Sequence, residues 1–187
     1  MPATAQSRRH QRAVSARVLL SLHANDNLQD PERWTWQALD KLPGWCLAGE
    51  SERLRVQRVC GALYLSPELR FWIHKSALGG LQELLGNTWE LIAEQADAMQ
   101  VPREPVAELI ASKGVDQETG DCAKLDSLLL AAGATVLRHS VDESLPRELL
   151  TESLGESLGE ISDLAAVNLL HAANALVDLP GAPVTHS

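Results

Sequence analysis

The stretch CGALYLSPELRFWIHK, residues 60–75, decides how the helices of this chain are divided. It holds the only Phe and the only Tyr of the chain together with one of its five Trp. Ser66 and Pro67 stand in its middle, and this pair is typical of a helix start, with Ser as the N-cap and Pro at the first helical position. The sequence therefore predicts that one helix begins at Ser51 and ends near Leu65, and that a second helix begins at Pro67.

The aromatic residues of this stretch have the spacing of core residues. Trp72 and Ile73 continue a series of apolar positions at helical intervals, so we expect them in the core. We expect Phe71 and Tyr64 in the core or at its edge. The Gly79-Gly80 pair predicts a break or a kink in the helix that follows, because glycine is a poor helix former.

The composition favours helices throughout. Leu and Ala dominate, aromatic residues make up 4% of the chain, and no segment alternates long enough to form a strand. Asp121 is placed to open a further helix as its N-cap. The sequence predicts an all-α fold, a single compact domain of about seven to nine short helices. This domain covers residues 12–179, with a disordered basic tail at 1–11 and a disordered tail at 180–187.

Residues 153–160, SLGESLGE, form a tandem tetrapeptide. Gly155 and Gly159 would each cost about 1 kcal/mol relative to Ala inside a helix. They indicate either close helix packing or a loosened segment. Three leucines four residues apart predict one helical stripe through this segment: Leu150, Leu154 and Leu158.

The charge is unevenly distributed. The chain has a net charge of −9, yet its first 17 residues contain four Arg and no acidic residue. With four of the 16 Lys and Arg in that segment, the remainder has 12 basic residues against 25 acidic ones. Such an acidic body would repel a phosphate backbone, which argues against nucleic-acid binding by the folded part.

The cysteines and the hydropathy bear on the environment in which the protein works. Cys46, Cys60 and Cys122 are odd in number, widely spaced and without a CxxC pair, which suits buried thiols in a reducing environment. No apolar run approaches the roughly 18 residues of a membrane-spanning helix, so we expect no direct membrane insertion.

No motif in the chain identifies a reaction. HExxH, GxSxG, GxGxxG and the P-loop pattern are all absent, and we expect no catalytic residue, no metal site and no cofactor. Cys60 falls at core spacing, which favours an inert buried thiol. The last of our alternatives is an enzyme whose site assembles from distant residues such as His74, His139 and Glu94. It comes last because no pair of residues has the spacing of a known catalytic motif.

The tryptophans are the strongest candidates for a partner surface. Trp34 and Trp36 point about 200° apart on one helix, so both cannot face one core from it. Trp45 follows a predicted turn at Pro43-Gly44. Exposed Trp is rare and is enriched at binding hot spots, which favours one of Trp34 and Trp36, together with Trp45, as a partner surface. The alternative is that the short helix lies in a groove and buries both indoles.

Three segments together resemble a known family: PERWTWQALDKLPGW at 31–45, RLRVQRVCGALYLSPELRFWI at 53–73 and ALGGLQELLG at 77–86. The order is a Trp/Pro segment, a Cys-Gly-Ala helix ending in a proline, and a Leu/Gly helix. This order resembles the small helical adaptor of the type III secretion sorting platform, the SctK family of YscK/PscK type. The likeness covers roughly residues 31–100.

The resemblance implies a non-enzymatic cytoplasmic protein of bacteria. It would link the cytoplasmic ring protein of the secretion apparatus to the cytoplasmic domain of an inner-membrane ring protein. Its partner surface would include Arg33, Trp34, Trp36 and Trp45, and its acidic body would speed association with a basic patch. The alternative is an acidic helical secretion chaperone or regulator that holds a client peptide in a Leu-lined groove and exposes a large apolar patch.

Overall fold

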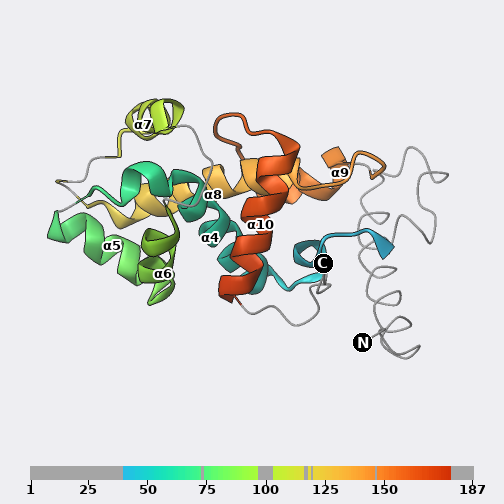
Figure 1. Cartoon of the computed structure of the whole chain (residues 1–187), viewed down its shortest axis with the longest axis horizontal. Coiled ribbons are helices and arrows are strands. Elements are labelled where there is room, and N and C mark those ends of the chain that lie inside the picture. Colours follow the sequence, from blue (N-terminus) through green and yellow to red (C-terminus); the bar gives the residue numbers. More distant parts are fainter. Residues whose placement is uncertain are drawn as a thin grey trace.

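The computed structural model describes residues 40–72, 74–96, 103–115, 118, 120–145 and 147–177 (Figure 1). Within these ranges the chain forms helices and no strand, so the predicted all-α class is confirmed. The two predicted tails lie outside the described residues. No helix of the described ranges combines the length and the apolar character needed to cross a membrane.

The elements follow one another along the chain with short connections. In order they are α3 (Gly44–Leu47), α4 (Glu50–Leu69), α5 (Lys75–Leu85), α6 (Thr88–Gln95), α7 (Arg103–Ser112), α8 (Cys122–His139), α9 (Arg147–Thr151), the 3-10 turn η3 (Glu152–Leu154) and α10 (Asp163–Val177).

The long helices α4 and α8 form the centre of the molecule, and α10 packs across both of them (Figure 1). The helices α5 and α6 pack at one end of this pair, and α7 packs against α4. Most of the core comes from the central pair, because nearly all residues from Val56 to Leu65 and from Leu128 to Leu137 are buried.

Two glycines bring α4 and α8 into backbone contact. A Cβ atom on Gly61 would lie 1.9 Å from the carbonyl oxygen of Leu129, and one on Gly133 would lie 1.8 Å from that of Gln57. Each glycine therefore faces a backbone carbonyl of the other helix. Residues 57 and 61 pair with 133 and 129 in reverse order, so the two helices run antiparallel at this contact.

The predicted helix junction at Ser66-Pro67 is wrong. Helix α4 continues through Pro67 to Leu69, and the next helix, α5, begins only at Lys75. Pro67 has no N–H to give to the carbonyl of Leu63, four residues earlier. The hydroxyl of Ser66 donates to that carbonyl at 2.8 Å instead, so the Leu63 carbonyl keeps a hydrogen-bond donor.

The aromatic residues after this proline have different environments. Tyr64 and Trp72 are buried, as expected, but Phe71 is 56% exposed and the expectation of a core position is wrong. The chain leaves the helix just before it, with the amide of Phe71 bonded back to the carbonyl of Glu68. The Phe71 ring instead lies under the guanidinium of Arg70, 4.6 Å from its centre. Ile73 lies outside the described residues.

The helix α5 runs through Gly79-Gly80 without the expected break. Gly80 is buried, and a Cβ atom there would lie 3.2 Å from the side chain of Leu125. The small residue thus allows α5 to approach α8 closely, and this packing offsets the low helix propensity of the pair.

The predicted helical stripe through the tandem tetrapeptide is also wrong. Helix α9 ends at Thr151, η3 ends at Leu154, and residues 155–162 are not helical. Gly155 has φ 79° and ψ −154°, a conformation that only glycine adopts readily. The three leucines at 150, 154 and 158 are nevertheless buried. We call residues 153–160 the strap.

Candidate protein-binding surface

One face of α10 is exposed and contains no Asp, Glu, Lys or Arg. Leu164 is 73% exposed and Val167 is 48% exposed, although both are large aliphatic side chains. The opposite side of the helix, including Leu169 and Ala173, is buried against the core. No charged residue follows Asp163 within the helix. We call the exposed stripe the α10 face; it consists of Leu164, Val167, Asn168, His171 and Ala175.

A cluster of charged groups fixes the start of α10. Asp163 accepts a hydrogen bond from Arg147 at 3.0 Å and pairs with Nδ1 of His139 at 2.9 Å. Arg147 also donates to the carbonyl of Val141. The hydrogen bonds from His139 and then from Arg147 lower the pKa of the Asp163 carboxyl below its ordinary value. The cluster ties the beginning of α10 to the end of α8 and the start of α9, which orients the α10 face.

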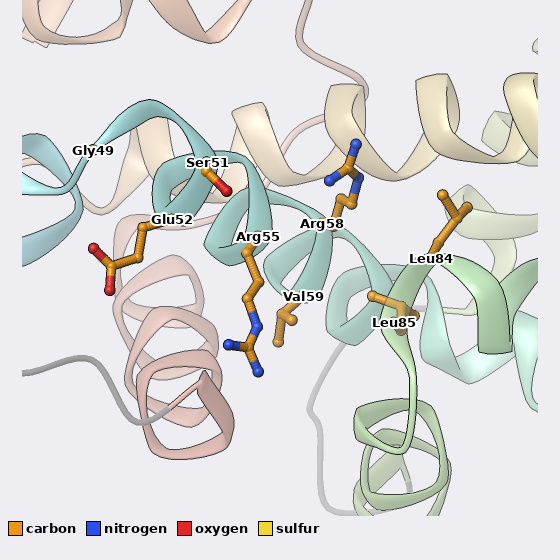
Figure 2. Close-up of a pocket in the computed structure, with 8 residues that line it drawn as sticks. All are labelled: Gly49, Ser51, Glu52, Arg55, Arg58, Val59, Leu84 and Leu85. Atoms are coloured by element: carbon orange, nitrogen blue, oxygen red, sulfur yellow. The ribbon is translucent and has the colours of Figure 1, made fainter.

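A second feature is an open hollow of about 620 Å³ beside α4 (Figure 2). Val59, Leu84 and Leu85 supply its apolar part. Figure 2 shows Arg58 directed toward α8, where it forms a bidentate pair with Asp126, whereas Arg55 points the other way. The remaining lining residues are Gly49, Ser51 and Glu52.

Arg55 gives this hollow its chemical character. It is exposed and forms no ion pair with the part of the chain that the structure describes. A guanidinium next to an apolar surface suits a carboxylate that is attached to an apolar group, as in a peptide side chain or chain end. The hollow thus combines an apolar wall with an exposed guanidinium.

The residues considered for catalysis do not form a site. His74 is exposed directly before α5, Glu94 is exposed on α6, and His139 bonds to Asp163. No hydrogen bond or ion pair of the described ranges joins any two of the three. Those ranges also contain no group of three or more His, Cys, Asp or Glu residues that could hold a metal ion.

Of the four residues expected at a partner surface, the structure describes one. Arg33, Trp34 and Trp36 lie outside the described residues. Trp45 lies in α3 and is only 2% exposed, so its indole is part of the core and not of an open surface. Burial of a large aromatic side chain stabilises the fold, and Trp45 therefore drops out of the proposed partner surface.

The α10 face was not among the residues singled out from the sequence, although the sequence contains a signal for it. The helix DLAAVNLLHAANALV has a single charged residue in 15 positions. A surface helix normally has a charged or polar face, whereas the exposed side of α10 has only Asn168 and His171 as polar groups beside its aliphatic side chains. The exposure of Leu164 excludes full burial in the monomer. No family model, no curated protein and no solved structure matches this chain.

Proposed function

We propose that this protein is a non-enzymatic cytoplasmic adaptor of a bacterial type III secretion system. It links the cytoplasmic ring protein of the sorting platform to the cytoplasmic domain of an inner-membrane ring protein. The observation that carries the binding role is the exposed, uncharged α10 face with Leu164 at its start. The assignment to this secretion system rests on the resemblance of roughly residues 31–100 to the SctK family.

The physical argument starts from the cost of leaving this face in water. Full burial of a Leu or Val side chain is worth about 1.5–3 kcal/mol, and Leu164 and Val167 are one helical turn apart. A partner that covers both gains several kcal/mol toward the free energy of association. The acidic remainder of the surface steers the protein toward a basic partner, and the uncharged stripe is where a close contact desolvates no ion.

A tagged copy expressed in its native cells tests the proposal. We expect the cytoplasmic ring protein of the secretion apparatus to co-purify, as identified by mass spectrometry. Val167→Asp should abolish this recovery, because it buries a charge in the contact. Leu91→Asp is the matched control: Leu91 lies on α6 and is 47% exposed against 48% for Val167, so both changes add one negative charge at equal exposure.

Two results would count against the adaptor role. One is a clean preparation without any component of the secretion apparatus under secreting conditions. The other is equal recovery of the ring protein by Val167→Asp and Leu91→Asp, which would move the contact away from the α10 face. Loss of recovery after replacing Trp34 and Trp36 together by Ala, with helicity unchanged by circular dichroism, would place a second contact at these residues.

The alternative is an acidic helical chaperone that binds a client peptide. The hollow favours it, because Val59, Leu84 and Leu85 offer an apolar surface beside the exposed guanidinium of Arg55. Recovery of a single secreted protein in the same purification would support this alternative. Arg55→Glu should then abolish recovery of the client, whereas an adaptor that uses the α10 face would be unaffected.

A further inference from the structure

The strap is held by side chains of the two central helices, and its first repeat contacts α4. Arg53 donates from Nη1 to the hydroxyl of Ser153 at 3.1 Å. The side-chain amide of Gln57 donates to the carbonyl of Leu154 at 3.0 Å and also to the carbonyl of Leu130 in α8 at 2.7 Å. Gln57 is buried, so it joins the strap to the interface between the two helices.

The second repeat is bound in the same way by α8. Arg138 donates to the hydroxyl of Ser157 at 2.8 Å. The buried hydroxyl of Thr135 donates to the carbonyl of Leu158 and accepts from its amide, both at 2.7 Å. Thr135 thus corresponds to Gln57, and Arg138 corresponds to Arg53.

The two repeats therefore meet two similar subsites, the first from within η3 and the second from a non-helical segment. In each, the Ser hydroxyl accepts from an Arg, the Leu side chain is buried, and the Leu carbonyl accepts from a buried polar side chain. Each is completed by a glycine of positive φ, 79° at Gly155 and 77° at Gly159. The two sequence repeats thus lie in two successive subsites of one groove.

A third wall of this groove comes from α7 and from the far part of α4. Lys113 pairs with Glu156 at 2.9 Å. Tyr64 donates from its hydroxyl to the carbonyl of Glu160 at 3.3 Å. A Cβ atom on Gly159 would lie 2.7 Å from the side chain of Leu109 and 2.8 Å from the Tyr64 hydroxyl oxygen. The positive φ of 77° at Gly159, together with these two neighbours, favours glycine at this position of the occupant.

The strap contacts the helices mainly through side chains, as a bound peptide ligand would. Residues 155–161 form no backbone–backbone hydrogen bond with the described part of the chain. Their contacts are the buried side chain of Leu158 and hydrogen bonds with side chains of the groove. Segments without a backbone ladder open at a lower free energy than the helices they cover.

We propose that the groove between α4, α8 and α7 is a peptide-binding site that the strap occupies in cis. Its occupant in trans is an extended acidic segment of a partner protein with two Leu-Gly steps four residues apart. Three cationic groups of the groove, Arg53, Arg138 and Lys113, select an occupant with Ser and Glu at the intervening positions. The partner segment binds when the strap leaves, so the strap lowers the apparent affinity by the fraction of time that the groove is filled.

The test uses the full chain and a fluorescent peptide SLGESLGE, with binding followed by anisotropy. Gly159→Ala weakens the strap in cis, since a positive φ and two close neighbours both oppose a Cβ there, while the groove and the peptide stay unchanged. We expect the peptide to bind this variant at least about tenfold more tightly than the wild type. Gly155→Ala, with the same sign of φ but nothing within 4 Å of its Cβ, should give a smaller gain.

Further variants and measurements keep the test decisive. Thr135→Val in the Gly159→Ala background should remove peptide binding again, because Thr135 belongs to the groove. If neither glycine variant binds the peptide better than the wild type while circular dichroism shows intact helices, the proposal is overturned. If Gly159→Ala does not fold, Gly155→Ala and hydrogen exchange of the wild type decide: the Leu158 amide must exchange at least about tenfold faster than the core amides of α4 and α8.

This inference is independent of the proposed adaptor function. Its experiment involves only this chain and its own sequence as the probe. Failure of peptide binding would leave the α10 face and the secretion partners untouched, and failure of the co-purification would leave the groove and its strap untouched.

Discussion

Replacing Gly61 by Ala tests the backbone contact at the centre of the fold. Inside a helix, Gly→Ala normally stabilises a protein by about 0.5–1 kcal/mol, since Ala restricts the unfolded chain and has the higher helix propensity. At Gly61 the new Cβ would lie 1.9 Å from the carbonyl oxygen of Leu129, 2.8 Å from its carbonyl carbon and 3.0 Å from the amide nitrogen of Gly133. All three atoms belong to the backbone of α8, so no side-chain rotation relieves the overlap.

The size of the effect follows from this geometry. The two helices must part by about 1 Å, and a gap of about 0.5–1 Å forfeits a quarter to a half of the dispersion energy of the atoms along the contact. Overpacking in a core typically costs about 1–3 kcal/mol of stability. The neighbours of the new Cβ are rigid backbone atoms, so we expect a cost at or above the upper end of that range. After the gain in propensity, we expect Gly61→Ala to lower the free energy of unfolding by about 2–4 kcal/mol.

Gly79 provides the matched control. It also lies inside a helix, α5, but nothing lies within 4 Å of a Cβ atom built on it. Gly79→Ala should therefore raise the free energy of unfolding by about 0.5–1 kcal/mol. The two Gly→Ala substitutions are thus expected to change the free energy of unfolding in opposite directions.

Urea unfolding at 25 °C, followed by circular dichroism at the helical band, measures both changes. In a domain of this size, 1 kcal/mol corresponds to about 2–4 °C in Tm, so Gly61→Ala should lower Tm by roughly 4–16 °C. The reasoning is refuted if Gly61→Ala is as stable as the wild type. Adding Gly133→Ala should cost less than its single effect, because one separation of the helices relieves both overlaps.

Three further predictions concern Ser66 beside the proline of α4, Asp163 at the start of α10, and the cysteine thiols. Ser66→Ala should cost about 1–2 kcal/mol by urea unfolding and clearly less in a Pro67→Ala background, where an N–H can satisfy the same carbonyl. The hydrogen bond with His139 is the main cause that lowers the pKa of Asp163 below its ordinary value of 3.8, so this carboxylate stabilises the fold above about pH 4 and loses that effect as the pH falls further. Asp163→Asn should accordingly be less stable than the wild type at pH 7, with the difference shrinking below pH 4 in the same assay. Burial raises the pKa of the Cys60 thiol and raises the pKa of the Cys46 thiol to about 12, so iodoacetamide at pH 8 should modify both only after unfolding and the more exposed Cys122 before it, as read by mass spectrometry.

The helical class and several helix ends were predictable because their causes are local. Asp121 caps α8 by accepting from the amides of Ala123 and Lys124, two and three residues away. Gly86 follows the last residue of α5 with φ 59° and ψ −145°, a conformation that only glycine adopts readily. Cys60 is buried as its spacing indicated. Propensity and capping act within one turn of helix, so they can be recognised in the sequence.

The candidate sites were not predictable to the same degree. The α10 face depends on which side of an almost uniformly apolar helix the core covers, and the sequence of α10 does not mark that side. Trp45 follows a turn signal, which suggested exposure, yet the packing of α3 against α4 buries it. Exposure of an apolar residue is decided by its neighbours in space.

What the sequence determined by itself is the helical class, several helix ends and the acidic net charge, because propensity, capping and net charge depend on residue type and near neighbours in the chain. What only the tertiary structure decided is the course of the chain where distant residues compete with local preference. The proline in α4 is tolerated because one hydroxyl replaces one lost N–H. The strap gives up the helix that its leucines favour because Gln57 and Thr135, 97 and 23 residues away, bind its carbonyl groups in the buried groove.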